Sequence, residues 1–171
     1  GLKNGNEVEF EDKMLEATLG PGLLSSSYDG LQNDLTTMTG VFLKRGEYTN
    51  PLNHEKLWDF TPIAKPGDKV VAADWLGEVK EGWLPHKIMV PFSFEGEYTV
   101  KSVAEAGQYN IDKTIAVLTD ASGEDVEVCM YQKWPVKVAI KGYKDKPRPS
   151  RIMETGVRVI DTLNPIAEGG T

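Results

Sequence analysis

The sequence predicts a mainly β protein, in which a small barrel-sandwich-like domain is flanked by connector strands and followed by a short C-terminal helix. Three observations support this fold class. Short apolar stretches alternate with polar residues at a period of two, which is the pattern of strands with one buried face. Turn-forming residues recur between these stretches, and the 171 residues include 17 glycines and 10 prolines. Short strands separated by tight turns favour a sandwich or barrel over βαβ units.

Two alternating runs give the clearest strand signals, and each is predicted to line one buried face of a sheet. The apolar positions of these runs are Ile88, Val90, Phe92 and Phe94 in the first, and Val126, Val128 and Met130 in the second. Turns are predicted at Pro66-Gly67-Asp68, Glu95-Gly96, Ala106-Gly107 and Ser122-Gly123. These signals place the β domain at residues 41–140.

Residues 1–40 read as a strand followed by a connector. Val8 and Phe10 alternate with glutamates, which predicts a strand with one wet face that belongs to a larger barrel. Gly20-Pro21-Gly22 then interrupts regular structure, and Tyr28-Asp29-Gly30 marks a turn. The connector is therefore expected at about residues 18–40.

Residues 141–171 read as a linker followed by a short helix. The stretch 141–150 is basic and proline-punctuated, which suits an exposed linker at a domain boundary. Thr155 is predicted to cap a helix that Pro165 ends. Val159, Ile160 and Leu163 fall near one face of that helix.

Composition excludes several classes of function. With 26 acidic and 19 basic residues the formal net charge is -7, which repels nucleic acid and anionic lipid surfaces. No apolar run approaches the ~20 residues of a membrane-spanning helix, and the start of the chain has no signal-peptide pattern. The single cysteine, Cys129, leaves no internal disulfide or thiolate pair and fits a reducing cytoplasm.

Individual residues give little support for catalysis. His54 and His86 lie far apart in the sequence without ligand-spaced partners, so we interpret them as surface or structural histidines. Cys129 has apolar neighbours and is expected to be a small buried hydrophobe. Most of the four tryptophans are expected in the core, and an exposed one would be a candidate for partner binding. We therefore predict no catalytic, cofactor-binding or metal-binding residue in this sequence.

Six groups of residues, in order, resemble the catalytic A (alpha) subunit of V/A-type rotary ATPases over nearly the whole chain. They are LGPGLL at 19–24 with YDGLQ at 28–32, FLKRG at 42–46, WDFTP at 58–62, HKIMVP at 86–91, QKWPV at 132–136, and TGVRVIDTL at 155–163 with PIA at 165–167 and GGT at 169–171. The resemblance implies three parts. Residues 1–40 would end the N-terminal barrel, residues 41–140 would form the outward insert (bulge) domain, and residues 141–171 would lead into the nucleotide-binding domain.

The same resemblance sets expectations for function. The P-loop and the catalytic glutamate would follow Thr171, so this chain alone would not be an enzyme, although the subunit would couple ATP hydrolysis or synthesis to proton or sodium translocation. ATP and Mg²⁺ would bind to that subunit outside these residues. The implied partners are the B subunit and the peripheral stalk, with no nucleic acid and no direct membrane contact. The implied location is the cytoplasmic head, peripheral to the membrane.

A lipoyl/biotinyl carrier-like domain is the alternative. The segment from Lys65-Pro66-Gly67-Asp68 to Lys87-Ile88-Met89 echoes the flattened barrel-sandwich of such carriers. In that interpretation Lys87 would be an attachment lysine on a tight hairpin. The Met-Lys pair of biotinylated domains and the Asp-Lys pair of lipoylated ones are both missing around Lys87.

Overall fold

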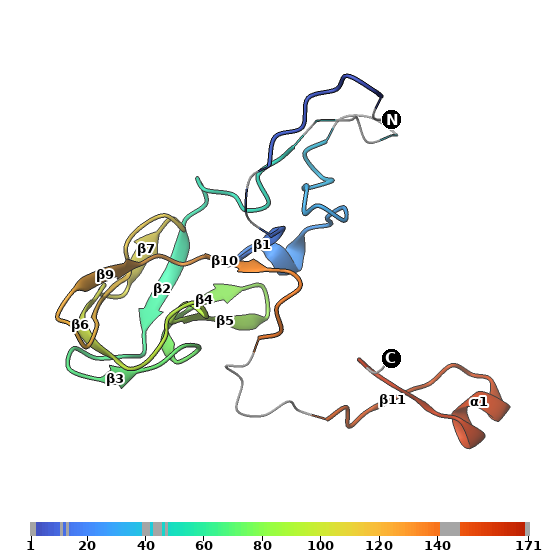
Figure 1. Ribbon diagram of the computed structural model, residues 1–171. Coiled ribbons are helices and arrows are strands. Elements are labelled where there is room, and N and C mark those ends of the chain that lie inside the picture. Colours follow the sequence, from blue (N-terminus) through green and yellow to red (C-terminus); the bar gives the residue numbers. More distant parts are fainter. Residues whose placement is uncertain are drawn as a thin grey trace.

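The structure, a computed structural model, describes residues 3–10, 12, 14–38, 42, 46, 48–140 and 148–169. Its central feature is a pair of four-stranded antiparallel sheets (Figure 1). The first has the order β5-β4-β2-β7 and consists of β2 (Trp58–Pro62), β4 (Trp75–Glu81), β5 (Leu84–Met89) and β7 (Gly107–Tyr109). The second has the order β3-β6-β8-β9 and consists of β3 (Lys69–Val70), β6 (Tyr98–Val103), β8 (Ala116–Thr119) and β9 (Asp125–Val128).

The two sheets share one hydrophobic core. Phe60 and Leu76 from the first sheet and Val100 and Leu118 from the second are almost inaccessible to solvent and belong to the same cluster. Burial of this apolar area is the main favourable term in folding. The mainly β, barrel-sandwich prediction is confirmed, and residues 58–128 form the body that we call the sandwich.

Strand alternation explains the core, with one interruption. Val128 and Met130 are buried and Val126 is half-buried, as the second alternating run predicts. In the first run Ile88 and Val90 are buried, but β5 ends at Met89. Pro91 follows Val90, and a proline has no N–H to continue a ladder. Phe92 and Phe94 therefore lie beyond the strand and are only half-buried.

A two-stranded ribbon carries the sandwich. Strand β1 (Glu16–Leu19) pairs antiparallel with β10 (Gln132–Pro135), so that Leu19 lies opposite Gln132. We call this ribbon the stem, because the chain leaves it at residue 20 and returns to it at residue 131. The 3₁₀ turn η1 (Leu23–Ser25) follows β1 directly.

The outer edge of β1 is covered by a side chain. Gln32 accepts the Thr18 N–H at Oε1 and donates from Nε2 to the Thr18 carbonyl, both at 2.7 Å. Its amide takes the place of a neighbouring strand residue. Unpaired strand edges promote pairing with other chains, and this contact occupies the outward-facing N–H and carbonyl of Thr18 on that edge.

The predicted strand at Val8 and Phe10 is wrong. Residues 7–10 belong to no strand, and Val8 and Phe10 are 62% and 81% exposed. A strand needs a hydrogen-bonded neighbour, and among the described residues none pairs with this segment. The alternating pattern by itself does not supply that neighbour.

The C-terminal segment forms a small unit of its own. Strand β11 (Ile152–Met153) pairs with β12 (Ile166–Ala167), and helix α1 (Arg158–Leu163) lies between them. The helix ends before Pro165, as predicted, but Val157, not Thr155, is its N-cap. The Asp161 carboxylate accepts hydrogen bonds from the N–H and hydroxyl of Thr155, which draws Thr155 out of the capping position.

The apolar face predicted for α1 is not buried in the described structure. Val159 and Leu163 are 65% and 79% exposed. None of the described helices is both long and apolar enough to cross a bilayer. The predicted domain boundaries at 40/41 and 140/141 and the linker residues 141–147 lie wholly or partly outside the described residues, so that division stays a prediction.

Replacing Gly77 with alanine is expected to destabilise the sandwich by about 1–3 kcal/mol through overpacking. A Cβ at Gly77 would lie 2.2 Å from Cε2 of Phe60 and 2.9 Å from the Thr61 carbonyl oxygen. Chemical denaturation measures the change in the free energy of unfolding. Gly30→Ala is the control, because a Cβ there meets no atom within 4 Å and its stability should stay within about 0.5 kcal/mol. Equal effects of the two substitutions would contradict this account of the core.

Candidate interaction surface

The two histidines each contact a single carboxylate. Nδ1 of His54 lies 2.8 and 3.0 Å from the two carboxylate oxygens of Asp112, and Nδ1 of His86 lies 2.8 Å from Oε2 of Glu81. Among the described residues no group of three or more His, Cys, Asp or Glu side chains is arranged to hold a metal ion. These pairs therefore serve to connect neighbouring segments of the fold.

Cys129 is half-buried and its thiol donates to the Tyr131 carbonyl at 3.3 Å. Burial raises the pKa of the Tyr131 phenol, and Cys129 and Asp112 add to that rise. The phenol is therefore held in its neutral form more strongly than a free tyrosine. Cys129 and Tyr131 therefore belong to the partly buried segment that connects β9 to β10.

The position of Lys87 contradicts the carrier alternative. An attachment lysine has to stand at the tip of a hairpin, whereas Lys87 lies inside β5, opposite Glu78 in the ladder. Its ammonium is hydrogen-bonded to the Glu78 carboxylate and lies 4.8 Å from the centroid of the Trp75 ring. The tip of that hairpin is instead occupied by Gly82 and Trp83. A paired lysine within a strand has no freedom to act as a swinging arm.

Two acidic side chains at the β8–β9 turn, Asp120 and Asp125, accept hydrogen bonds from neighbouring residues. The Asp120 carboxylate accepts hydrogen bonds from the Ser122 hydroxyl and the Glu124 N–H, and these contacts lower the pKa of Asp120. The ammonium of Lys101 and the Thr119 hydroxyl similarly lower the pKa of Asp125. The Asp120 contacts close the β8–β9 turn, whereas the ion pair of Asp125 with Lys101 joins β9 to β6.

The tryptophans are distributed differently from the prediction that most lie in the core. Trp58 is 4% exposed, whereas Trp75 and Trp83 are 53% and 89% exposed. Trp134 is half-buried on β10. A β-bulge between Trp75 and Gly77 interrupts the alternation of β4, so Trp75 stays exposed while the next residue, Leu76, is fully buried. Trp83 lies in the turn between β4 and β5, where no second sheet covers it.

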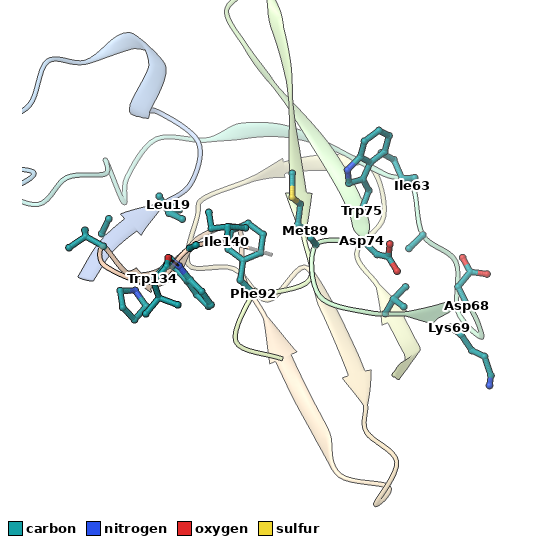
Figure 2. A pocket seen from close by; sticks show the side chains of 18 residues that line it. Leu19, Ile63, Asp68, Lys69, Asp74, Trp75, Met89, Phe92, Trp134 and Ile140 are labelled. Carbon is teal, nitrogen blue, oxygen red and sulfur yellow. Dashed lines mark hydrogen bonds between the residues drawn. The ribbon is translucent and has the colours of Figure 1, made fainter. Parts of the chain in front are cut away.

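A broad apolar groove of about 1340 Å³ lies between the stem and the sandwich. Its stem side includes Leu19 and Trp134, and its sandwich side includes Trp75 and Met89. Figure 2 shows these side chains around the groove, with Asp68 and Lys69 at one end. Sequence reasoning did not find this groove, because its two walls come from segments far apart in the chain that meet only after β1 pairs with β10.

The groove continues along the segment that follows β10. Val136, Val138 and Ile140 line it, and Phe92 packs edge-on against Trp134 with ring centroids 5.7 Å apart. A second hollow of about 500 Å³ lies between β5 and the turn at residues 19–24. Together with Trp83, these features form the exposed apolar surface of the described chain, and surfaces of this kind are typical of contacts with other protein.

Comparison with known proteins gives a consistent result. Residues 49–137 match the family described as the ATP synthase alpha/beta subunit barrel-sandwich domain. Proteins named V-type ATP synthase alpha chain are 47% identical in Borrelia garinii subsp. bavariensis and Borrelia turicatae and 46% identical in Treponema denticola, over 100% of this chain. The chain spans about 30% of the length of these relatives.

These matches cover all six groups of residues on which the resemblance rests, and they confirm the resemblance to the V/A-type A subunit. The matched family is also a barrel-sandwich domain, in agreement with the two sheets and their common core. The chain therefore belongs to the ATP synthase alpha/beta subunit barrel-sandwich family.

Proposed function

We propose that this chain is a non-catalytic scaffold within the A subunit of a V/A-type ion-translocating ATPase, and that its sandwich projects from the head of the complex to meet the peripheral stalk. The stem carries this proposal. Leu19 and Gln132 are ladder partners, so the segment that contains the sandwich leaves and re-enters the stem at neighbouring residues. An insertion whose two ends lie side by side can project without distorting the domain that carries it.

The activity proposed for the whole subunit comes from its relatives. Their printed name, V-type ATP synthase alpha chain, supports a role in coupling ATP synthesis or hydrolysis to the movement of protons or sodium ions. In this proposal ATP and Mg²⁺ bind to residues outside these 171, and the neighbours are the B subunit and the stalk. The subunit belongs to the cytoplasmic head, without direct membrane contact.

A mechanical role explains why a projection is useful. A rotary motor has to hold its head against torque, and a rigid projection offers a lever on which a stator can press. Transient contacts of this kind bury about 1,200 Å² or less, so a few exposed anchors are enough. Trp83 at the tip of the β4–β5 hairpin is the most exposed tryptophan of the four.

Titration calorimetry of the 171-residue chain with Mg-ATP is expected to show no saturable heat. A P-loop binds phosphate through a run of backbone amides and a Gly-Lys-Ser/Thr sequence, and no Gly-Lys-Ser/Thr sequence occurs within these 171 residues. Adenosine alone serves as the control for weak stacking on exposed tryptophans. Binding of Mg-ATP in the micromolar range would contradict the scaffold role.

Removing residues 20–131, which contain the connector and the sandwich, from the full-length subunit is expected to reduce ATP-driven ion pumping strongly. ATP hydrolysis by the detached head is expected to be largely retained. The register of the stem defines the deletion: residues 20–131 are replaced by Asn-Gly, which joins Leu19 to Gln132 through a two-residue hairpin turn. Pumping into vesicles and the uncoupled ATPase rate are measured on the same preparations, after assembly has been checked. Equal loss of both activities in an assembled complex would show that the sandwich supports the catalytic fold itself.

A point variant tests which surface meets the stalk. Trp83→Ala in the full-length subunit is expected to weaken stalk binding by about tenfold, since loss of an aromatic anchor costs about 1–2 kcal/mol. Trp75→Ala is the matched comparison, because Trp75 is also exposed but lines the groove and contacts Lys87. Binding of the purified stalk to each assembled head is the measurement. A larger loss for Trp75→Ala would move the contact from the hairpin to the groove.

A further inference from the structure

The stem alone does not fix the direction in which the sandwich points. It consists of two strands of four residues each, and two-stranded ribbons are weakly stable and twist readily. A projection that transmits force needs a second contact between its base and its body. The structure contains two such contacts. The Phe92 N–H donates to Oε1 of Gln132 on β10 at 2.8 Å, and a buried side chain at the end of β4 holds the turn that follows β1.

Glu81 makes the contact at the end of β4. It is the last residue of β4 and is 5% exposed, and only one other polar residue, Asn33, is buried in the described part of the chain. Its Oε1 accepts the Gly22 N–H at 2.8 Å and the Leu24 N–H at 3.1 Å. Its Oε2 lies 2.8 Å from Nδ1 of His86 on β5. A carboxylate is buried at a high cost unless such donors surround it, so these contacts hold it in one position.

The turn that Glu81 holds has little room to move. Pro21 is almost completely buried, and a Cβ on Gly20 would lie 2.8 Å from Cβ of Tyr131 and 3.0 Å from Cδ1 of Leu52. Gly22 has a φ of 111°, a backbone conformation that residues with a side chain rarely adopt. The turn continues directly from β1, so a bond from Glu81 to this turn is a bond from the sandwich to the stem.

We propose that Glu81 is a positioning residue that locks the sandwich to the stem at a fixed angle, through the amides of Gly22 and Leu24 and with His86 as the partner of its second oxygen. We call these four residues the joint. This inference goes beyond the scaffold role, because it concerns the chain alone and holds whether or not the sandwich meets a stalk.

Amide hydrogen exchange on the 171-residue chain tests the joint. Glu81→Met keeps the length and burial of the side chain and removes both oxygens. Exchange at Gly22 and Leu24 is expected to become at least about tenfold faster, which is the effect of losing a hydrogen bond to a charged group. Exchange at the core residues Val79 and Leu118 is expected to stay unchanged. Residual dipolar couplings of the stem and sandwich amides should fit one alignment tensor in the unaltered chain and two in the variant.

Two further variants keep the proposal falsifiable. Glu78→Met is the matched control, because Glu78 lies on the same strand and pairs with Lys87 but does not contact the turn, and it should leave exchange at Gly22 and Leu24 unchanged. Glu81→Gln keeps one acceptor oxygen and should give a smaller acceleration than Glu81→Met. Unchanged exchange at Gly22 and Leu24 in Glu81→Met would overturn the proposal. An equal acceleration at Val79 and Leu118 would also overturn it, because Glu81 would then stabilise the whole sandwich without positioning it.

Discussion

The arrangement of the described chain depends on the pairing of β1 with β10. This short antiparallel ladder joins segments on either side of the sandwich, with Leu19 opposite Gln132. It places the residues at which the chain enters and leaves the sandwich next to each other. The two sheets therefore form one domain between two neighbouring ends. The apolar groove follows from the same pairing, since Trp134 reaches it from β10 and Leu19 from β1.

Two kinds of interaction stabilise this arrangement. The hydrophobic core between the sheets provides most of the favourable free energy and has no preferred direction. The polar contacts are directional. The buried Glu81 binds backbone N–H groups of the turn that follows β1, and the half-buried Gln32 binds the backbone of Thr18 in the stem. Such hydrogen bonds add little net stability, because each of them replaces a hydrogen bond that the same groups make to water in the unfolded chain. Their contribution is to select one geometry among several with similar burial.

Apolar surface is exposed on several parts of the described chain. Several described titratable groups are paired locally, as in His54 with Asp112 and Lys87 with Glu78. The large hollows are lined mainly by aliphatic and aromatic side chains. Exposed apolar residues also gather on the C-terminal unit, where α1 buries no residue. Such surfaces are typical of parts that other protein covers in a larger assembly.

The sequence by itself determined the fold class, most of the turns and most of the core, because strand alternation and glycine or proline at turns are local properties of the chain. The turn predicted at Ala106-Gly107 is wrong at Gly107, which begins β7 and pairs with Phe60. The family resemblance was also local, since it rested on short ordered groups of residues. Only the tertiary structure decided the stem, the groove, the burial of Glu81 and the exposure of Trp75 and Trp83. The strand expected at Val8 and Phe10 failed for the same reason. A periodic pattern shows that a segment can bury one face, but which partner covers it is decided by contacts between residues far apart in the sequence.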